Sequence, residues 1–405
     1  MYRNILLIVG LLMVLLNLSC EWQSTLDAGD NPPPGPQALK VPEAYKTIQL
    51  AINAAEDGDE IVVASGTYTD AGNRDLRFGG KVITLRSAGG PDSTTIDCKG
   101  STSKPHRAFI FMSEDSNTVI EGFTIIKGFA SEADAQLKGW GGAVYCETSS
   151  PKFINCIFFR NDADFGGAVA CRTASPIFEN CEFNSNDARK DGGAVTAEGG
   201  AQPVFRSCTF YENESLQRGG AFNCSSASPN ISDSRFESNM AAGFGGVAFC
   251  NSSSPSLTNC EAFKNTAQEG GAIYATSGSN PHLVNCSLVQ NTGRLGGGGL
   301  SCATNSKATL QECIIAFSST GEAIRILDVN STPSVRCTDL YNNAGGDWVG
   351  DSLSVKAGID GNFSADPNFC EVVLGDLQLR ADSPCLENNN DCSKQIGALV
   401  GICTE

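Results

Sequence analysis

A Gly-Gly pair returns every 25 to 27 residues through the middle of this 405-residue chain. The pairs begin at Gly141, Gly166, Gly192, Gly219, Gly245, Gly270 and Gly296, and Gly321 starts a degenerate copy. A constant period of this length is typical of a solenoid, in which each repeat buries its apolar face only against its neighbours. The repeat therefore predicts a stack of coils around a narrow core, rather than two or three globular domains.

Other positions keep the same register as the glycine pairs. One column reads Asn155, Asn180, Asn259 and Asn285, with Ser207 and Asp233 in the gaps. A second column reads Cys156, Cys181, Cys208, Cys260, Cys286 and Cys313. A third reads Asn161, Asn186, Asn213, Asn239, Asn265 and Asn291, mostly preceded by an apolar residue three positions earlier, at Phe158, Phe183, Phe210, Phe236 and Leu288.

Short segments such as Ala143–Cys146 alternate between apolar and variable residues. This alternation is typical of a strand with one face in a core and the other in water. Three short strands and three corners fit one coil, and successive coils of a β-stack lie about 4.8 Å apart. We therefore predict an all-β fold, a single-stranded parallel β-helix with coils of about 25 residues.

The glycine and asparagine columns are interpreted as corners of the coil. Glycine adopts positive φ without penalty at a tight corner, and asparagine tolerates the left-handed region better than most residues. Their regularity is structural, and no catalytic role is expected for them. The clearest corner residues are Gly141, Gly142, Gly166, Gly167, Gly192, Gly193, Asn155 and Asn180.

The combination of Gly-Gly-Ala-(Ile/Val) with Phe-x-x-Asn resembles the repeat of the chlamydial polymorphic outer-membrane proteins, over roughly residues 139–345. Members of that family are surface β-helices, and many of them act as adhesins. The resemblance implies a right-handed helix on the cell surface and suggests adhesion.

Residues 1–19 have the form of a signal peptide. Ile5–Leu16 is an apolar run that is too short to span a bilayer comfortably. Leu18-Ser19-Cys20 resembles a bacterial lipobox, which implies lipidation of Cys20, but Asn17 stands where Leu is usual, and an ordinary signal peptide is the alternative. Residues 20–40 are then a Pro-rich, lipid-anchored tether. We expect an exported protein at the outer membrane or cell surface.

The β-helix is expected over residues 41–365, with a short capping helix at its start. Val41–Ile52 has apolar residues at helical spacing, and Glu60–Ala64 is a predicted strand. This order is similar to the N-terminal cap of pectate-lyase-like and pectin-methylesterase-like β-helices, in which the helix covers the open end of the core. Asp366–Cys370 and Asp382–Cys385 resemble the closing segment of many bacterial β-helix proteins, so residues 366–405 are expected as a C-terminal cap.

Four cysteines lie in this expected cap: Cys370, Cys385, Cys392 and Cys403. An exported protein can form disulfides, but four cysteines allow three pairings. We favour Cys385–Cys392, which closes a short loop, and Cys370–Cys403, which pins the last segment. Stacked repeat cysteines have parallel Cβ directions about 4.8 Å apart, longer than the ~3.8 Å of a disulfide, so buried thiols are expected there.

The net charge of −17 argues against a nucleic-acid partner, because phosphate binding needs clustered Lys and Arg. Membrane contact is expected through the lipid anchor only. A polysaccharide or a component of a host or other cell surface remains as a candidate partner.

One acidic stack stands out among the predicted coils. Asp162, Asp187 and Glu214 directly follow the third column on three successive coils, where like charges about 4.8 Å apart repel. A bound Ca²⁺ ion would relieve this repulsion, since it favours several oxygen ligands. Arg189 and Lys190 offer simple neutralisation as the alternative, and no other cofactor is expected.

No residue is singled out as catalytic. His282 lies in a variable outer column, and His106 has no identifiable partner in the sequence. The first hypothesis is a surface-exposed, non-enzymatic β-helix that acts in binding or adhesion, with glycans as a candidate ligand. The alternative is a carbohydrate-active lyase or hydrolase, which needs a cleft. The best place for one is beneath the insert Lys127–Trp140, which carries Glu132, Asp134, Lys138 and Trp140.

Overall fold

The computed structural model describes residues 38–112, 117–132, 134, 137–399 and 401–403. The signal peptide 1–19, Cys20 and nearly all of the tether 20–40 lie outside the described residues. Residues 37–405 form one compact unit, to which the following description applies. None of the helices in the described ranges is both long and apolar enough to cross a membrane.

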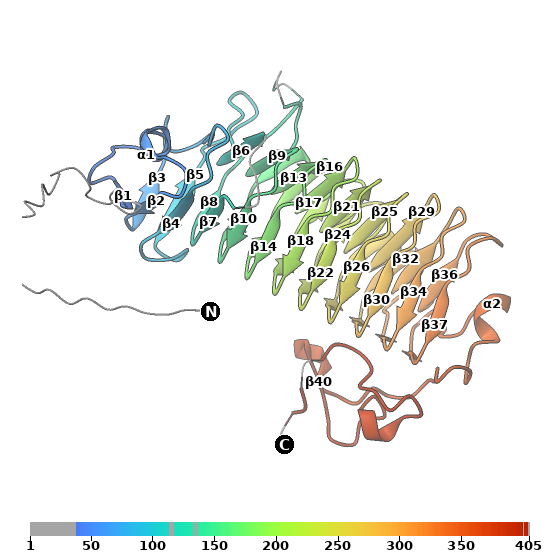
Figure 1. Ribbon diagram of the computed structural model, residues 1–405. Coiled ribbons are helices and arrows are strands. Elements are labelled where there is room, and N and C mark those ends of the chain that lie inside the picture. Colours follow the sequence, from blue (N-terminus) through green and yellow to red (C-terminus); the bar gives the residue numbers. More distant parts are fainter. Residues whose placement is uncertain (1–37, 113–116, 133, 135–136, 400, 404–405) are drawn as a thin grey trace, which may run out of the picture. The chain divides into compact units, whose positions relative to one another are not determined.

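This unit is a parallel β-helix, as the repeat predicts (Figure 1). Strands of successive coils pair in parallel and build sheets that run along the stack. The 12-stranded sheet A contains β1 (Ala38–Val41), β2 (Glu60–Val63), β4 (Thr84–Ser87), β7 (Val119–Glu121), β10 (Lys152–Ile154), β14 (Ile177–Glu179), β18 (Val204–Arg206), β22 (Asn230–Ser232), β26 (Ser256–Thr258), β30 (His282–Val284), β34 (Thr309–Gln311) and β37 (Ser334–Arg336).

Two further sheets complete the three expected sides. The 11-stranded sheet B contains β3 (Gly66–Tyr68), β5 (Thr94–Asp97), β8 (Thr124–Ile126), β11 (Ile157–Phe159), β15 (Glu182–Asn184), β19 (Thr209–Tyr211), β23 (Arg235–Glu237), β27 (Glu261–Phe263), β31 (Ser287–Val289), β35 (Ile314–Ala316) and β38 (Asp339–Tyr341). The 9-stranded sheet C contains β6 (Phe109–Met112), β9 (Val144–Glu147), β13 (Val169–Arg172), β17 (Val195–Glu198), β21 (Phe222–Ser225), β25 (Ala248–Asn251), β29 (Ile273–Thr276), β33 (Leu300–Cys302) and β36 (Ile324–Ile326).

The regular coils carry a fourth strand that the sequence did not predict. This 6-stranded sheet D lies between the third column and the glycine pairs. It contains β12 (Asp162–Phe165), β16 (Asp187–Asp191), β20 (Glu214–Ser215), β24 (Met240–Ala241), β28 (Thr266–Glu269) and β32 (Thr292–Gly296).

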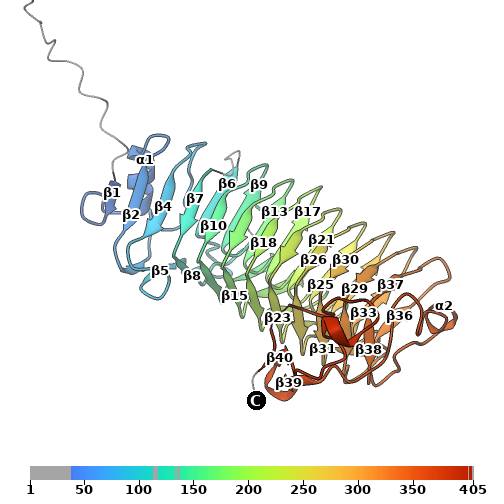
Figure 2. The same ribbon diagram turned by 60° about the horizontal axis from the view of Figure 1, so that its bottom comes forward.

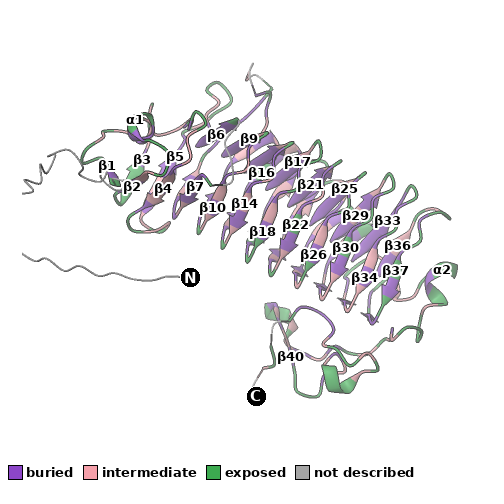
Figure 3. Cartoon of the chain, viewed as in Figure 1, coloured by how far each residue is buried: buried purple, intermediate pink, exposed green. Residues whose placement is uncertain are grey.

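Buried residues recur on the strands from coil to coil (Figure 3), and aromatic side chains stack among them in the core. The ring centroids of Phe153 and Phe178 are 5.0 Å apart, and those of Phe178 and Phe205 are 4.8 Å apart. A parallel column runs Phe158, Phe183, Phe210 and Phe236, at spacings of 4.8, 4.7 and 4.9 Å. The repeat cysteines are buried beside these rings, and none is in a disulfide, as expected.

Both glycines are required by the backbone in the pairs that begin at Gly141 to Gly270, and in the next copy the corner is formed by Gly297 and Gly298, because Gly296 pairs with Glu269. The first adopts the left-handed region, with φ of 62° at Gly141 and 66° at Gly166. The second has no room for a side chain, because a Cβ on Gly142 would lie 2.1 Å from the carbonyl oxygen of Gly167 in the next coil. The close stacking of coils at this corner therefore explains the whole Gly-Gly column.

The two asparagine columns differ. Asn155 and Asn180 are left-handed corner residues, with φ of 49° and 53°. The column from Asn161 to Asn291 is not a left-handed corner, which corrects the sequence interpretation. There the left-handed residue is the one before it, such as Arg160 with φ of 53°, and the asparagine is buried.

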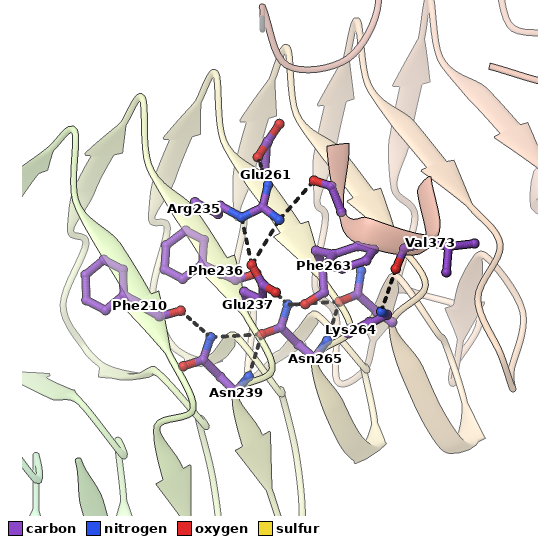
Figure 4. Close-up of polar contacts among 12 residues, drawn as sticks. Phe210, Arg235, Phe236, Glu237, Asn239, Glu261, Phe263, Lys264, Asn265 and Val373 are labelled. Atoms are coloured by element: carbon purple, nitrogen blue, oxygen red, sulfur yellow. Dashed lines mark hydrogen bonds and ion pairs between the residues drawn. The ribbon is translucent and has the colours of Figure 1, made fainter. Parts of the chain in front are cut away.

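These buried side chains form an amide ladder along the stack (Figure 4). The Nδ2 of Asn239 donates to the Oδ1 of Asn265 at 2.9 Å and to the carbonyl of Phe210 at 2.9 Å. The backbone N–H of Asn239 donates to that same Oδ1 at 2.9 Å. Each amide in the middle of the ladder thus links its own coil to the coil before it and to the coil after it.

The N-terminal end of the core is covered by α1 (Ile48–Ala54), as predicted. Thr47 caps it by accepting a hydrogen bond from the backbone N–H of Leu50. Ile48, Ala51 and Ile52 are buried and belong to the same apolar cluster as the coils. The helix therefore closes the first coil.

At the other end the core is closed by α2 (Asp351–Ser354), not by residues 366–405. Leu353 of α2 is buried in the main core, and Trp348 packs against it. The C-terminal segment instead lies against the outer face of sheet B (Figure 2). It contains the antiparallel pair β39 (Phe369–Glu371) and β40 (Asp376–Leu379), with short 3₁₀ helices at Val372–Leu374 and Glu387–Asn389.

This segment is fastened to sheet B by polar and apolar contacts. Arg235 Nη2 donates to the carbonyl of Gly375 at 3.0 Å, and Lys264 Nζ donates to that of Val373 at 3.0 Å (Figure 4). Phe369 and Leu377 join Phe263 in one apolar cluster. The outer face of sheet B is therefore occupied over these coils.

The disulfides only partly follow expectation. Cys370 is joined to Cys403, the favoured pairing, but Cys392 is joined to Cys337. The expected Cys385–Cys392 bond is wrong, because Cys385 is a buried thiol whose Sγ lies 3.5 Å from Asp339 Oδ2. Cys337 has a left-handed φ of 48°, and it occupies the Asn155 corner column, one coil after Glu312. Its thiol therefore faces the C-terminal segment.

Candidate functional site

The insert Lys127–Trp140 is held to the first regular coils by buried charge. Arg107 Nη1 donates to Asp134 Oδ2 at 2.7 Å, and its Nε donates to the carbonyls of Trp140 and Gly141 at 2.9 and 2.8 Å. Burial lowers the pKa of Arg107, and the neighbouring Asp134 opposes that shift. Asp134 therefore serves to fix the insert.

Sheet D holds the insert from its other side. Arg189 donates to Asp162 at 2.5 Å, to Asp164 at 2.8 Å and to the carbonyl of Ala130 at 2.6 Å. Lys190 forms an ion pair with Glu132. Two of the acidic residues singled out in the insert, Glu132 and Asp134, are thus structural partners of basic residues.

A pocket of about 320 Å³ lies where the insert meets sheet C, at the place where the sequence predicted a cleft. It is lined by Leu137, Lys138, Trp140, Tyr145, Glu147 and Arg172. The insert supplies the first three of these, and the outward positions of β9 and β13 supply the others. The pocket therefore depends on two neighbouring coils and on the insert together.

One wall of the pocket is aromatic. The indole of Trp140 stacks on Phe165 of the next coil, with ring centroids 4.4 Å apart and planes at 16°. The guanidinium of Arg172 lies 5.1 Å from the centre of the Trp140 ring. Both aromatic side chains remain half-buried, so part of their surface is open to a ligand.

The rest of the wall is polar and balanced in charge. The Tyr145 hydroxyl raises the pKa of the Arg172 guanidinium, which lies 3.7 Å from Glu147 and 3.9 Å from Glu198. Burial raises the pKa of Tyr145 and that of Glu198. The nearby Arg172 guanidinium partly opposes both shifts. Both carboxylates beside the pocket therefore face a guanidinium, and the phenol stays protonated at neutral pH.

A second aromatic cluster lies farther along sheet C. Tyr274 is 4.6 Å from Phe244 and 5.8 Å from Phe249, measured between ring centroids. Arg218 lies 5.0 Å over the ring of Phe249 and binds both carboxylate oxygens of Asp191, at 2.8 and 2.6 Å.

The two clusters share one column, made of the residues immediately before the glycine pairs. It reads Trp140, Phe165, Asp191, Arg218, Phe244 and Glu269, with neighbours bridged from coil to coil. Four coils separate Trp140 from Phe244, which corresponds to about 19 Å. Sequence reasoning identified Trp140 alone. The sequence signal that could have identified the other residues of this column is the recurrence of aromatic side chains, since three of its six positions are aromatic.

The acidic stack is present in the predicted register. Asp162 pairs with Asp187, and Asp187 with Glu214, on adjacent strands of sheet D. Burial raises the pKa of Asp162 to about 6, against the influence of Arg189, and burial also raises the pKa of Asp187. Arg189 supplies the neutralisation given as the alternative, whereas Lys190 does not, since it pairs with Glu132. Among the residues that the structure describes, no three acidic, thiol or imidazole side chains are grouped to hold a metal ion.

The histidines lie away from the pocket walls. His282 is exposed on β30, in the predicted outer column. His106 does have a partner, contrary to the sequence analysis, because its Nδ1 lies 2.6 Å from Asp75 Oδ2. The backbone N–H of Arg107 binds the other oxygen of Asp75 at 2.8 Å. This contact orders the coil that carries the buried Arg107.

Comparison with known proteins agrees with this architecture. A family model described as a right handed beta helix region matches residues 83–254. The structure of pectate lyase Pel9A is similar over 84% of this chain and 85% of that chain, with a TM-score of 0.51 and 14% identity. The chain has the right-handed, pectate-lyase-like β-helix fold.

The catalytic domain of a GH87 alpha-1,3-glucanase in complex with nigerose is also similar, with 12% identity and a TM-score of 0.41, over 80% of this chain and 62% of that one. No curated protein matches the sequence. At 14% identity the likeness to the pectate lyase describes the fold alone and leaves the site to be judged by its own residues.

Proposed function

We propose that this protein is a surface-exposed, non-enzymatic β-helix that binds glycans through the Trp140 pocket. The observation that carries the proposal is the stacked Trp140–Phe165 pair beside the hydrogen-bonding set of Tyr145, Arg172 and Glu147. A sugar ring has an apolar C–H face and a rim of hydroxyls. An aromatic wall that meets paired donors and acceptors is suited to both.

The charges of the site favour an uncharged glycan. Arg172 is already compensated by Glu147 and Glu198, and Arg218 by Asp191. The chain carries a net charge of −17, which repels a polyanion at long range. The proposed ligand is therefore a neutral oligosaccharide or polysaccharide.

The spacing of the aromatic clusters favours a chain over a single sugar. Trp140 and Phe244 lie about 19 Å apart along one face, as four coils at the spacing of paired strands require. A glycan that follows the helix axis would contact both clusters. We expect affinity to rise with chain length until both are reached.

Binding to an array of neutral and acidic glycans tests the proposal. We expect neutral chains to bind the full-length protein and to be recovered intact. Trp140→Ala should weaken binding about tenfold, or about 1.4 kcal/mol. Arg172→Gln tests the polar wall without removing the ring. Tyr211→Ala on β19, which also removes a half-buried outward aromatic side chain, is the matched control. Equal binding by all four proteins would contradict the proposed site.

The alternative function is a carbohydrate-active lyase or hydrolase, and one residue favours it. Asp162 is half-buried beside the insert, and burial raises its pKa to about 6, which suits a general acid or base near neutral pH. The similar structure named a pectate lyase has the same fold. Release of unsaturated products from an acidic polysaccharide, followed by absorbance and lost in Asp162→Asn, would support this alternative.

Cell-surface display is part of the proposal. Metabolic labelling with an alkyne fatty acid tests lipidation of Cys20, and we expect the label to disappear in Cys20→Ala. Retention of the label in that variant would rule out this anchor.

A further inference from the structure

Sheet C ends at β36, and no strand within the described part of the chain pairs with its outer edge. β36 is the terminal member of the nine-stranded order, and its recorded partner is β33. The N–H of Leu327 donates to Cys302, and the carbonyl of Ala323 accepts from Leu300, so these groups point toward β33. Because alternate residues of a strand point to opposite edges, the backbone groups of Ile324 and Ile326 point outward.

The next coil begins as if to supply the missing strand and then turns away. The N–H of Ala323 donates to Gly346 at 2.9 Å, which repeats the corner bond of earlier coils. Asp347 then accepts hydrogen bonds from the backbone N–H groups of Asn342 and Asn343, at 3.1 and 3.0 Å. The chain continues into α2, and the strand position beside β36 is left vacant.

A pocket of about 490 Å³ occupies this vacant position. Ile324 and Ile326 form its floor, and Leu327, Val329 and Val349 form its apolar walls. The last three are 38%, 93% and 42% exposed, which is unusual for adjoining aliphatic side chains. Ile326 is only half-buried although it points toward the core, because no coil lies beyond it.

The rim of the pocket is acidic. Glu322, Asp328 and Asp351 supply three carboxylates. The single guanidinium in the lining, Arg325, is directed to the carbonyl of Leu295 and lies 3.8 Å from Glu269. The site thus combines an open strand edge, apolar walls and negative charge.

We propose that the free edge of β36 binds an extended basic peptide segment of a partner protein, which pairs with Ile324 and Ile326 as a further strand of sheet C. An unpaired edge is a template for strand addition, and side chains of alternate parity then enter the pocket. Apolar residues of the segment would meet Leu327 and Val349, and Lys or Arg residues would meet the carboxylate rim. A second copy of this acidic chain is a poorer electrostatic match.

Fluorescence anisotropy with labelled synthetic peptides tests this proposal on the full-length protein. We expect a peptide of alternating Val and Lys to bind, and added salt to weaken the binding. The same peptide with N-methyl groups on alternate amides should bind about tenfold more weakly or not at all, since it cannot form the ladder. A Val-Glu peptide should not bind. Equal binding of the methylated and unmethylated peptides would overturn strand pairing.

Two variants locate the site. Ile326→Pro removes an outward N–H on an edge strand, where proline is tolerated, and Val349→Lys places a like charge in the pocket. Each should weaken binding about tenfold. Val355→Lys, at a 70% exposed valine outside the pocket, is the matched control. Unchanged affinity in both test variants would overturn the proposal. So would concentration-dependent self-association that Val349→Lys abolishes, which would assign the edge to a second copy. Neither outcome bears on the glycan site.

Discussion

The amide ladder offers a quantitative test of how the coils are held together. Asn213 is fully buried, and its side chain makes four hydrogen bonds. Its Nδ2 donates to the carbonyl of Phe183 and to Asn239 Oδ1, both at 2.9 Å. Its Oδ1 accepts from the backbone N–H and the side-chain amide of Asn186, at 3.1 and 2.9 Å.

Asn213→Ala removes all four bonds and leaves the buried N–H of Asn186 without an acceptor. A net contribution of about 1 kcal/mol for each bond predicts a loss of about 4 kcal/mol in the free energy of unfolding. Asn291, near the end of the ladder, makes three such bonds, so its replacement should cost less. Asn230→Ala, on the exposed face of β22, should cost less than about 0.5 kcal/mol.

Urea unfolding followed by circular dichroism gives the three free energies. Since a solenoid can open one region at a time, hydrogen exchange of the amides around residue 213 should report the same order locally. The reasoning is refuted if Asn213→Ala is no more destabilising than Asn230→Ala, because the ladder would then contribute nothing beyond packing.

Three further predictions concern the C-terminal segment and the acidic stack. Non-reducing peptide maps should show Cys337–Cys392 and Cys370–Cys403, also in Cys385→Ser, and a Cys385–Cys392 peptide would contradict the structure. Burial raises the pKa of Asp339 to about 7 from an ordinary value of 3.8, so its contribution to stability is present at acidic pH and is lost as pH rises to 7. Wild-type protein should therefore lose up to about 4 kcal/mol of unfolding free energy between acidic pH and pH 7 through this group, and Asp339→Asn should remove that loss. An unchanged slope of unfolding free energy against pH in Asp339→Asn would disprove this prediction. For calcium, isothermal titration with heat that Asp187→Ala abolishes would support binding at Asp162, Asp187 and Glu214, whereas no heat in the wild-type protein would remove that hypothesis.

The features that sequence predicted are those that repeat from coil to coil. The Gly-Gly column recurs because successive backbones lie so close together that a side chain would clash, as a Cβ on Gly142 would with Gly167. Each of these coils therefore needs glycine at the same position. Stacked phenylalanines such as Phe158 and Phe183 likewise pack against the phenylalanine at the same position of the next coil. A local pattern also sufficed for α1, because its cap and apolar spacing lie within a few residues.

The features that sequence missed depend on contacts without such a copy. The corner column at Asn155 accepts Ser207 and Asp233, whereas the ladder column is asparagine at all six positions from Asn161 to Asn291. An unvarying asparagine indicates that the side-chain amides pair with one another. The sequence analysis instead attributed it to the preference of asparagine for a left-handed backbone conformation. The Cys337–Cys392 bond spans 55 residues and depends on where the C-terminal segment lies.

The candidate site was only partly predictable for the same reason. The sequence located a cleft beneath Lys127–Trp140, but Tyr145, Glu147 and Arg172 became part of it through the packing of neighbouring coils. Glu132 and Asp134, which had been singled out as polar residues of the insert, are engaged in fixing it to the coils. Charge compensation of this kind is visible only once the chain is folded.

The structure of the protein bound to the neutral oligosaccharide that ranks highest on the array tests the central claim most directly. The account predicts a sugar ring on the indole of Trp140, hydroxyls within hydrogen-bonding distance of Arg172 and Glu147, and a chain that extends toward Phe244. A glycan found on sheet A or at the end of the stack, with the Trp140 pocket empty, would contradict it.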